Sequence, residues 1–245
     1  MKELYLSGYD NFILPFMAGI VFVLSWCVIG AIRVITQLTK EDRIRFFKSL
    51  LNPRIMLLNV RDWFCDCLFH VKLWKRNKLL GYMHSSIAFG WFMIILIGHI
   101  EVLIYTPERI HQPWYPIFFR YFVAVNDSTM KGSFFFFLMD FFLLMILSGI
   151  ILAIVKRARS KFFGMRRTTR ATITDLVGLY SLWCIFPLRL LAEGFTADIS
   201  GGSFLTKSLN SVLHFFFADQ MNMLPTWWAY SLALGVFMFA LPFSR

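Results

Sequence analysis

Two histidines lie near opposite ends of one apolar segment, residues 81–101, whose sequence is GYMHSSIAFGWFMIILIGHIE. His84 and His99 are fifteen residues apart, which separates them by roughly 22 Å along a helix but by only about 60° around its axis. They therefore share one helix face, with Trp91 on the stripe between them. Because haem iron binds a neutral imidazole nitrogen, such a helix can supply one ligand to each of two b-type haems stacked across a membrane.

The same histidines also allow a structural interpretation, in which each bonds to a neighbouring helix or lies at the membrane interface. Ionisable residues at membrane depth are costly and are more often functional, so we predict His84 and His99 as iron ligands. Small residues that would let a macrocycle approach the helix backbone are Gly81, Ala88 and Gly98. We expect His70 and His111 to lie at solvent or at the interface.

Further ionisable residues lie inside or next to apolar segments. Arg189 and Glu193 are four residues apart and can pair along one helix face. The functional alternative is that Arg189 neutralises a haem propionate, while Glu101 or Asp140 accepts protons from a quinol oxidised nearby. A carboxylate in an apolar environment suits that chemistry, so Glu101 and Asp140 are the candidate catalytic residues.

Composition indicates a membrane protein, because 58% of the 245 residues are hydrophobic and 18% are aromatic. Crossing a hydrocarbon core takes about 20 mostly apolar residues, and five segments are long enough: 11–38, 79–105, 133–155, 172–192 and 224–243. Helices satisfy their own backbone groups in lipid, and the alternating pattern of a membrane β-barrel is absent. The sequence therefore predicts one all-α domain over residues 1–245, a polytopic bundle of five transmembrane helices.

Basic residues predict the orientation of this bundle. The connection 39–78 holds ten Lys and Arg residues and the connection 156–170 holds seven. The opposite side has five, namely Lys2, Arg109, Arg120, Lys131 and Lys207. Basic residues gather on the cytoplasmic side, which places the N-terminus outside and the C-terminus inside. The net charge of +11 is then a topology signal, and no nucleic-acid partner is expected because no recognition motif accompanies it.

The connection 39–78 mixes basic residues with Phe, Leu and Trp. We predict one or two amphipathic helices on the inner membrane surface, with a docking surface for a cytoplasmic partner as a compatible alternative. The first span is too long for the apolar region of a signal peptide and is expected to be retained. No P-loop, dinucleotide fingerprint, zinc-protease motif or nucleophile elbow occurs.

The segments GYMHSSIAFGWFMIILIGHIE, WKRNKLL and WWAYSLALGVFMFALPFSR carry a family resemblance. The chain resembles the gamma (cytochrome b) subunit of respiratory nitrate reductases. It is more closely similar to the membrane domain at the N-terminus of heterodisulfide-reductase-like iron–sulfur oxidoreductases. The resemblance implies one or two haems b held between the second and fifth spans, exchange of electrons with the quinone pool, and a bacterial cytoplasmic membrane location. It also implies a cytoplasmic iron–sulfur partner or fused domain, whose [4Fe-4S] clusters lie outside this chain.

The fifth span departs from the family pattern, because residues 224–245 contain no histidine and Tyr230 stands where an outer ligand is sought. Two sources for the missing ligands are open. His214 can fold back to serve the outer haem, or an inner ligand lies beyond Arg245. The rival interpretation is a haem-free membrane anchor or scaffold for a cytoplasmic redox partner, with structural histidines.

Overall fold

The structure is a computed structural model that describes residues 11–105, 115–120, 129–162, 172–217 and 224–244. Every regular element in these ranges is helical, and none is a strand. The elements are η2 (Asn11–Ile13), α1 (Leu14–Gln37), α2 (Lys40–Leu51), α3 (Pro53–Trp63), the π turn η3 (Phe64–Leu68), α4 (Val71–Arg76), α5 (Lys78–Tyr105), α6 (Tyr115–Phe118), α7 (Met130–Phe162), α8 (Ile173–Ser200), α9 (Phe204–Phe217), α10 (Leu224–Ala240) and η6 (Leu241–Phe243). The predicted all-α class is therefore confirmed for the described residues.

Five helices are long and apolar enough to cross a membrane, namely α1 with η2, α5, α7, α8 and α10 with η6. They match the five predicted spans, which indicates a multi-pass membrane protein. Two of them are longer than predicted. Helix α7 continues through its basic end to Phe162, and α8 continues beyond Ala192 to Ser200. Charged side chains end an apolar window in the sequence, but they do not end a helix.

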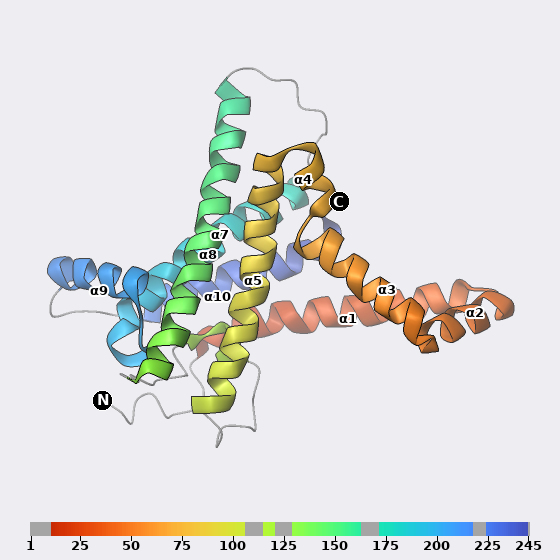
Figure 1. Cartoon of the computed structure of the whole chain (residues 1–245), viewed down its shortest axis with the longest axis horizontal. Helices are drawn as coiled ribbons and strands as arrows, with labels where there is room; N and C mark the ends of the chain where they lie inside the picture. Colours follow the sequence, from red (N-terminus) through yellow and green to blue (C-terminus); the bar gives the residue numbers. More distant parts are fainter. Residues whose placement is uncertain (1–10, 106–114, 121–128, 163–171, 218–223, 245) are drawn as a thin grey trace.

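The five helices form two groups (Figure 1). Helices α5 and α7 pack side by side and run across a second group, in which α10 lies against both α1 and α8. The first pair is antiparallel, since Ser86 lies against Gly149 and Gly90 against Ile146. Helix α1 runs parallel to α10. The Phe16 N–H donates to Ser231 Oγ, and further along both helices the Phe22 ring lies 4.7 Å from the Phe239 ring, measured between centroids. Within each group these directions agree with the order of the candidate spans, since α1 and α10 are the first and fifth and α5 and α7 are the second and third.

Aromatic packing closes one end of the core. The Phe119 ring lies 5.5 Å from Phe12, 5.4 Å from Tyr230 and 6.0 Å from Trp227, measured between ring centroids. All four of these side chains are buried. Because each ring removes a large apolar area from water or lipid, this cluster ties the start of α1 and the start of α10 to the segment after α6.

Helix α1 approaches α10 closely at one glycine, which leads to a stability prediction. A Cβ atom on Gly235 would lie 2.5 Å from the carbonyl oxygen and 2.9 Å from the carbonyl carbon of Pro15. Backbone atoms cannot move aside as a flexible side chain does, so Gly235→Ala should force the helices apart and lower the free energy of unfolding by about 2 kcal/mol. Unfolding by dodecyl sulfate in mixed micelles, followed by tryptophan fluorescence, measures this.

Gly30 provides the matched control for this substitution. It lies in α1, the other helix of this contact, and a Cβ atom there would have no neighbour within 4 Å. Alanine is a better helix former than glycine, so Gly30→Ala should leave stability unchanged or raise it by about 0.5 kcal/mol. Equal losses in the two variants would refute close α1–α10 packing as the cause.

The connection between α1 and α5 differs from the prediction of one or two helices. It forms three α-helices and the π turn η3. Asn52 caps α3 through its side chain, and Pro53 starts that helix, which separates α2 from α3. His70 adopts a positive φ of 49° before α4, and this backbone reversal lays α4 against α5.

Candidate functional site

The face of α5 that carries His84 and His99 is directed towards α8 and α10. Trp91, between the two histidines, packs its ring against Phe186 of α8 at 5.4 Å and Phe237 of α10 at 5.5 Å between centroids. The His84 and His99 side chains are exposed, one before and one after this contact along the helix. The shared face predicted from the spacing is therefore present, and both imidazoles are accessible.

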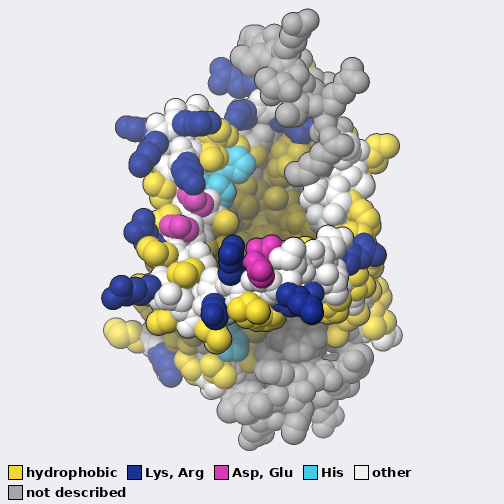
Figure 2. All heavy atoms as spheres, turned by 90° about the vertical axis from the view of Figure 1, so that its right-hand side faces the viewer, with side chains coloured by type: hydrophobic (Ala, Val, Ile, Leu, Met, Phe, Trp, Pro, Cys, Tyr) yellow, Lys and Arg dark blue, Asp and Glu magenta, His cyan; other side chains and the backbone are white. Residues whose placement is uncertain are grey.

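His84 has another histidine beside it, which the sequence did not predict. Its ring stacks on that of His70 with 5.5 Å between centroids and 27° between the ring planes. The Nδ1 atom of His70 is buried without a partner in the described part of the chain. Figure 2 shows a hollow with apolar walls on this side of the molecule, with histidine side chains at its edge.

The glycines expected to admit a macrocycle are already in contact with protein, so that expectation is wrong for both. A Cβ atom on Gly81 would lie 2.7 Å from the Trp74 ring, and one on Gly98 would lie 3.0 Å from the carbonyl oxygen of Ile117. These glycines let α4 and α6 pack closely on α5. Ala88 is half-buried on the histidine face.

His214 lies on α9, where its Nε2 atom is 2.8 Å from a carboxylate oxygen of Asp198 on α8. Both side chains are well exposed. This contact joins α9 to α8 and occupies the Nε2 atom of His214, which leaves only Nδ1 for a metal while the contact is kept. His111 lies outside the described residues.

A buried ion pair occupies the far end of α5. Glu101 is fully buried, and its Oε1 atom lies 3.2 Å from Nη2 of Arg120. The same guanidinium also donates to the carbonyl oxygen of Ser200 at 3.4 Å and lies 5.1 Å from the centre of the Phe136 ring. Arg120 thus joins α5, α7 and the end of α8. Charge counting had placed it among outer loop residues, and its position within an aromatic run, IFFRYF, is the one sequence signal of burial.

A second buried ion pair lies on α8. Arg189 Nε is 2.8 Å from Glu193 Oε1, and both side chains are almost fully buried. The pairing predicted from their spacing is confirmed. Arg189 also lies beside the hydroxyl of Tyr230, which itself donates to the carbonyl oxygen of Phe118 at 3.2 Å. Both residues are already engaged inside the protein.

Asp140 of α7 caps the N-terminus of α9. Its Oδ2 atom accepts hydrogen bonds from the backbone N–H groups of Ser203, Leu205 and Thr206 at 3.2, 2.8 and 3.0 Å, and from the Thr206 hydroxyl at 3.1 Å. A helix N-terminus leaves such N–H groups unpaired and favours a negative charge. The carboxylate therefore holds α9 against the bundle.

Several polar atoms of this buried cluster lack a partner in the described part of the chain. They are Glu101 Oε2, Arg120 Nε and Nη1, Asp140 Oδ1 and Arg189 Nη2. Because both donors and acceptors are unpaired, water suits them better than an ion of either sign. The cluster consists of two buried ion pairs and a capping carboxylate that leave some polar atoms unpaired among the described residues.

Known proteins offer no guide to this site. Comparison of the chain with family models, curated proteins and solved structures finds no match. The chemistry of the residues themselves therefore has to decide between functions. Across the described ranges, no three His, Cys, Asp or Glu side chains gather where they could hold a metal ion.

A haem needs fewer protein ligands than a bare metal ion, because its ring supplies four nitrogens. One imidazole on each side of the iron completes the coordination. His84 and His99 each present an accessible ring on the same helix face, and these are the residues of α5 that would hold haem iron. Opposite ligands are not evident among the described histidines, since His70 stacks beside His84 and His214 bonds to Asp198.

Proposed function

We propose that this chain is a membrane electron-transfer domain that exchanges electrons between quinone or quinol and a cytoplasmic iron–sulfur oxidoreductase through b-type haem. The observation that carries the proposal is the α5 face on which Trp91 packs towards α8 and α10 while His84 and His99 remain exposed on either side. The resemblance to the nitrate reductase gamma subunit and to the membrane domain of heterodisulfide-reductase-like proteins is part of the same proposal.

The residues of this chain have distinct parts in that function. A b-type haem supplies reversible one-electron transfer. His84 and His99 would hold the iron, and the apolar side chains around them would keep water away. Glu101 is the candidate proton acceptor for quinol, because its Oε2 atom has no partner among the described residues. Asp140 likewise keeps one unpartnered oxygen, Oδ1, while its Oδ2 atom holds the start of α9, and Arg189 is paired with Glu193.

The proposed placement is a bacterial cytoplasmic membrane, with the N-terminus outside and the C-terminus inside. Helices α2 and α3 would lie on the inner surface, since they expose many large apolar side chains, such as Phe47, Leu51 and Leu57, beside numerous Lys and Arg residues. Amphipathic helices of this composition bind anionic membrane surfaces. The iron–sulfur partner, fused or separate, would dock on this basic side.

A second candidate function is a haem-free membrane anchor or scaffold for a cytoplasmic redox partner. The histidine contacts favour it, because His70 and His84 stack on each other and His214 bonds to Asp198. In this alternative the histidines fasten α4 to α5 and α9 to α8. The two candidates differ in whether the folded protein takes up haem.

A reduced-minus-oxidised optical spectrum of the purified protein, produced with haem supplied, tests the proposal. We expect a b-type α-band in the native sequence that falls by about half in His84→Ala and in His99→Ala if each holds one of two haems. Leu96→Ala is the control, since Leu96 is an exposed residue of α5 between the two histidines. Well-folded protein without any haem band would refute electron transfer through haem and leave the anchor.

A further inference from the structure

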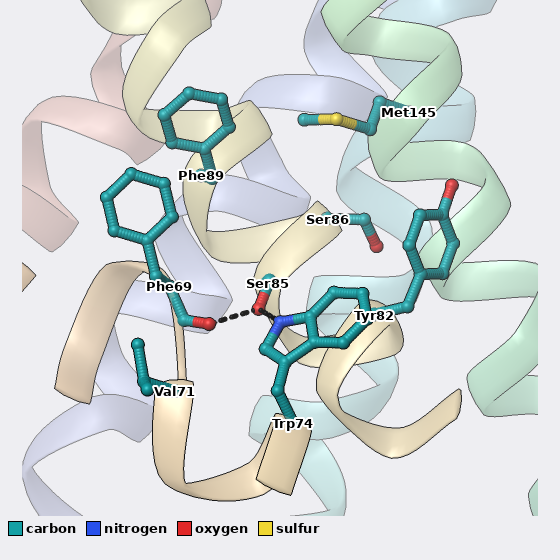
Figure 3. Close-up of a pocket in the computed structure, with 8 residues that line it drawn as sticks. All are labelled: Phe69, Val71, Trp74, Tyr82, Ser85, Ser86, Phe89 and Met145. Carbon is teal, nitrogen blue, oxygen red and sulfur yellow. Dashed lines mark hydrogen bonds between the residues drawn. The ribbon is translucent and has the colours of Figure 1, made fainter. Parts of the chain in front are cut away.

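A groove of about 460 Å³ lies between α4, α5 and α7 (Figure 3). Phe69 and Phe89 lie on one side of it, with 5.2 Å between their ring centroids, and Trp74, Tyr82 and Met145 line other parts. Its volume is within the range of small-ligand sites, which are about 300–1,000 Å³. The residues that line it are not those of the histidine face or of the buried ion pairs.

The hydroxyl and indole groups around the groove are already hydrogen-bonded within the protein. Trp74 donates from its indole N–H to Ser85 Oγ at 2.8 Å, and that hydroxyl donates to the carbonyl oxygen of Phe69 at 2.6 Å. The Tyr82 hydroxyl pairs with Ser148 at 2.8 Å, and Ser86 donates to the carbonyl oxygen of Met83. A polar ring system would find few partners here, whereas a hydrocarbon chain needs none.

The groove is formed by fixed side chains. Trp74 packs so closely on Gly81 that any side chain there would collide with it. Ser86 packs equally closely on Gly149 of α7. The walls are therefore held in place before any ligand enters, which lowers the entropic cost of binding.

Three basic residues lie where α4 ends and α5 begins, directly after Trp74 of the groove. Lys75 and Arg76 follow Trp74 directly, and Lys78 begins α5. None of these three has a carboxylate partner in the part of the chain that the structure describes. Lys72 differs, because its 2.6 Å hydrogen bond to Asp66 raises its pKa above the ordinary value. Lys156, near the end of α7, lies within electrostatic range of His84 in the same region.

We propose that this groove binds one anionic phospholipid, with an acyl chain between the Phe69–Phe89 wall and Trp74 and with its phosphate on Lys75, Arg76 and Lys78. The apolar walls select the chain, and the unpaired charges select the headgroup. Tryptophan is favoured at the boundary between the two because its ring is apolar and its N–H is polar. The site would hold α4 on α5 in the membrane, whether or not the protein carries haem.

Native mass spectrometry of the delipidated full chain tests this, with dioleoyl phosphatidylglycerol and dioleoyl phosphatidylcholine titrated separately. We expect the protein to bind one phosphatidylglycerol molecule tightly and to bind phosphatidylcholine more weakly. The K75Q/R76Q/K78Q variant should bind phosphatidylglycerol with an affinity that is lower by about fivefold per charge removed. The matched control is R33Q/K131Q/K207Q, which removes three exposed charges from α1, α7 and α9, outside α2, α3 and the groove, and should leave the affinity unchanged.

Two further measurements separate the acyl chain from the headgroup. Val71→Trp would fill the groove from α4 and should abolish the tight lipid, while Leu79→Trp, on an exposed residue outside the groove, should retain it. Soluble glycerophosphoglycerol carries the headgroup without acyl chains. It should not displace bound phosphatidylglycerol when the two are present at equal concentrations. Equal binding of the two lipids, equal loss in both triple variants, full competition by the free headgroup, or unchanged binding in Val71→Trp would each overturn the proposal.

Discussion

Arg120→Ala should lower the free energy of unfolding by about 4 kcal/mol, the largest single-residue effect that we expect. The substitution leaves Glu101 as a buried carboxylate without its 3.2 Å partner, in a position with no exposed surface. It also removes the contact with the Phe136 ring and the hydrogen bond to Ser200. Removing one member of a buried pair is costly because the other charge loses compensation and cannot reach water.

Unfolding by dodecyl sulfate in mixed micelles, followed by far-ultraviolet circular dichroism, measures this loss. The double variant E101Q/R120Q removes both charges together and should recover at least half of it. The exposed pair Lys72–Asp66 supplies the control, because Lys72→Ala removes a contact that solvent screens and should cost far less than Arg120→Ala. An Arg120→Ala protein as stable as the Lys72→Ala protein would mean that Glu101 is not buried as a charged partner of Arg120.

Asp140→Ala should be the second most damaging substitution, with a loss of about 3 kcal/mol. It leaves three backbone N–H groups and the Thr206 hydroxyl without the acceptor that now holds the start of α9. Asp140→Asn keeps one acceptor oxygen and should lose about half as much. Hydrogen exchange of the α9 amides, compared with those of α10, localises the effect, because α9 should lose protection first.

The same two variants decide between the structural and the catalytic interpretation of Asp140. If the carboxylate acts as a cap, Asn and Ala variants differ in α9 protection and in stability. If it acts as a proton acceptor, Asp140→Asn keeps its stability and loses quinol-dependent haem reduction. Native α9 protection in Asp140→Ala would contradict the capping role.

The sequence predicted what depends on local pattern. The five spans follow from hydropathy, and the Arg189–Glu193 pair follows from the spacing of one helical turn. The position of His84 and His99 on one face follows from helix geometry alone. Each of these features needs only residues that are close along the chain.

Features that join distant segments could not be predicted in the same way. Asp140 bonds to residues 63 to 66 positions further on, and no local pattern links an aspartate in one helix to the start of another. Arg120 was counted as a loop charge, because hydropathy does not show which side chains fold inwards. His70 reached His84 only through the backbone reversal at its own positive φ.

Two glycines of α5 were expected to make room for a haem macrocycle, but the groups that approach them belong to the protein. A small residue in a membrane helix permits close approach, but its sequence does not say what approaches. At Gly81 the neighbour is Trp74, and at Gly98 it is Ile117. Both glycines serve contacts within the protein.

The capping of α9 by Asp140 also has a consequence for biosynthesis. On the proposed topology, α7 enters the membrane before Ser203 and Thr206 have been made. The Asp140 carboxylate is then in the membrane without the backbone N–H groups that later donate to it. A lone aspartate inside a span raises the cost of insertion, by up to about 3 kcal/mol at the helix centre. Glu101 lacks its partner over a shorter stretch of synthesis, because Arg120 follows it by only 19 residues. In this order of synthesis, the Asp140 carboxylate of α7 lacks its hydrogen-bond donors until the start of α9 has been made.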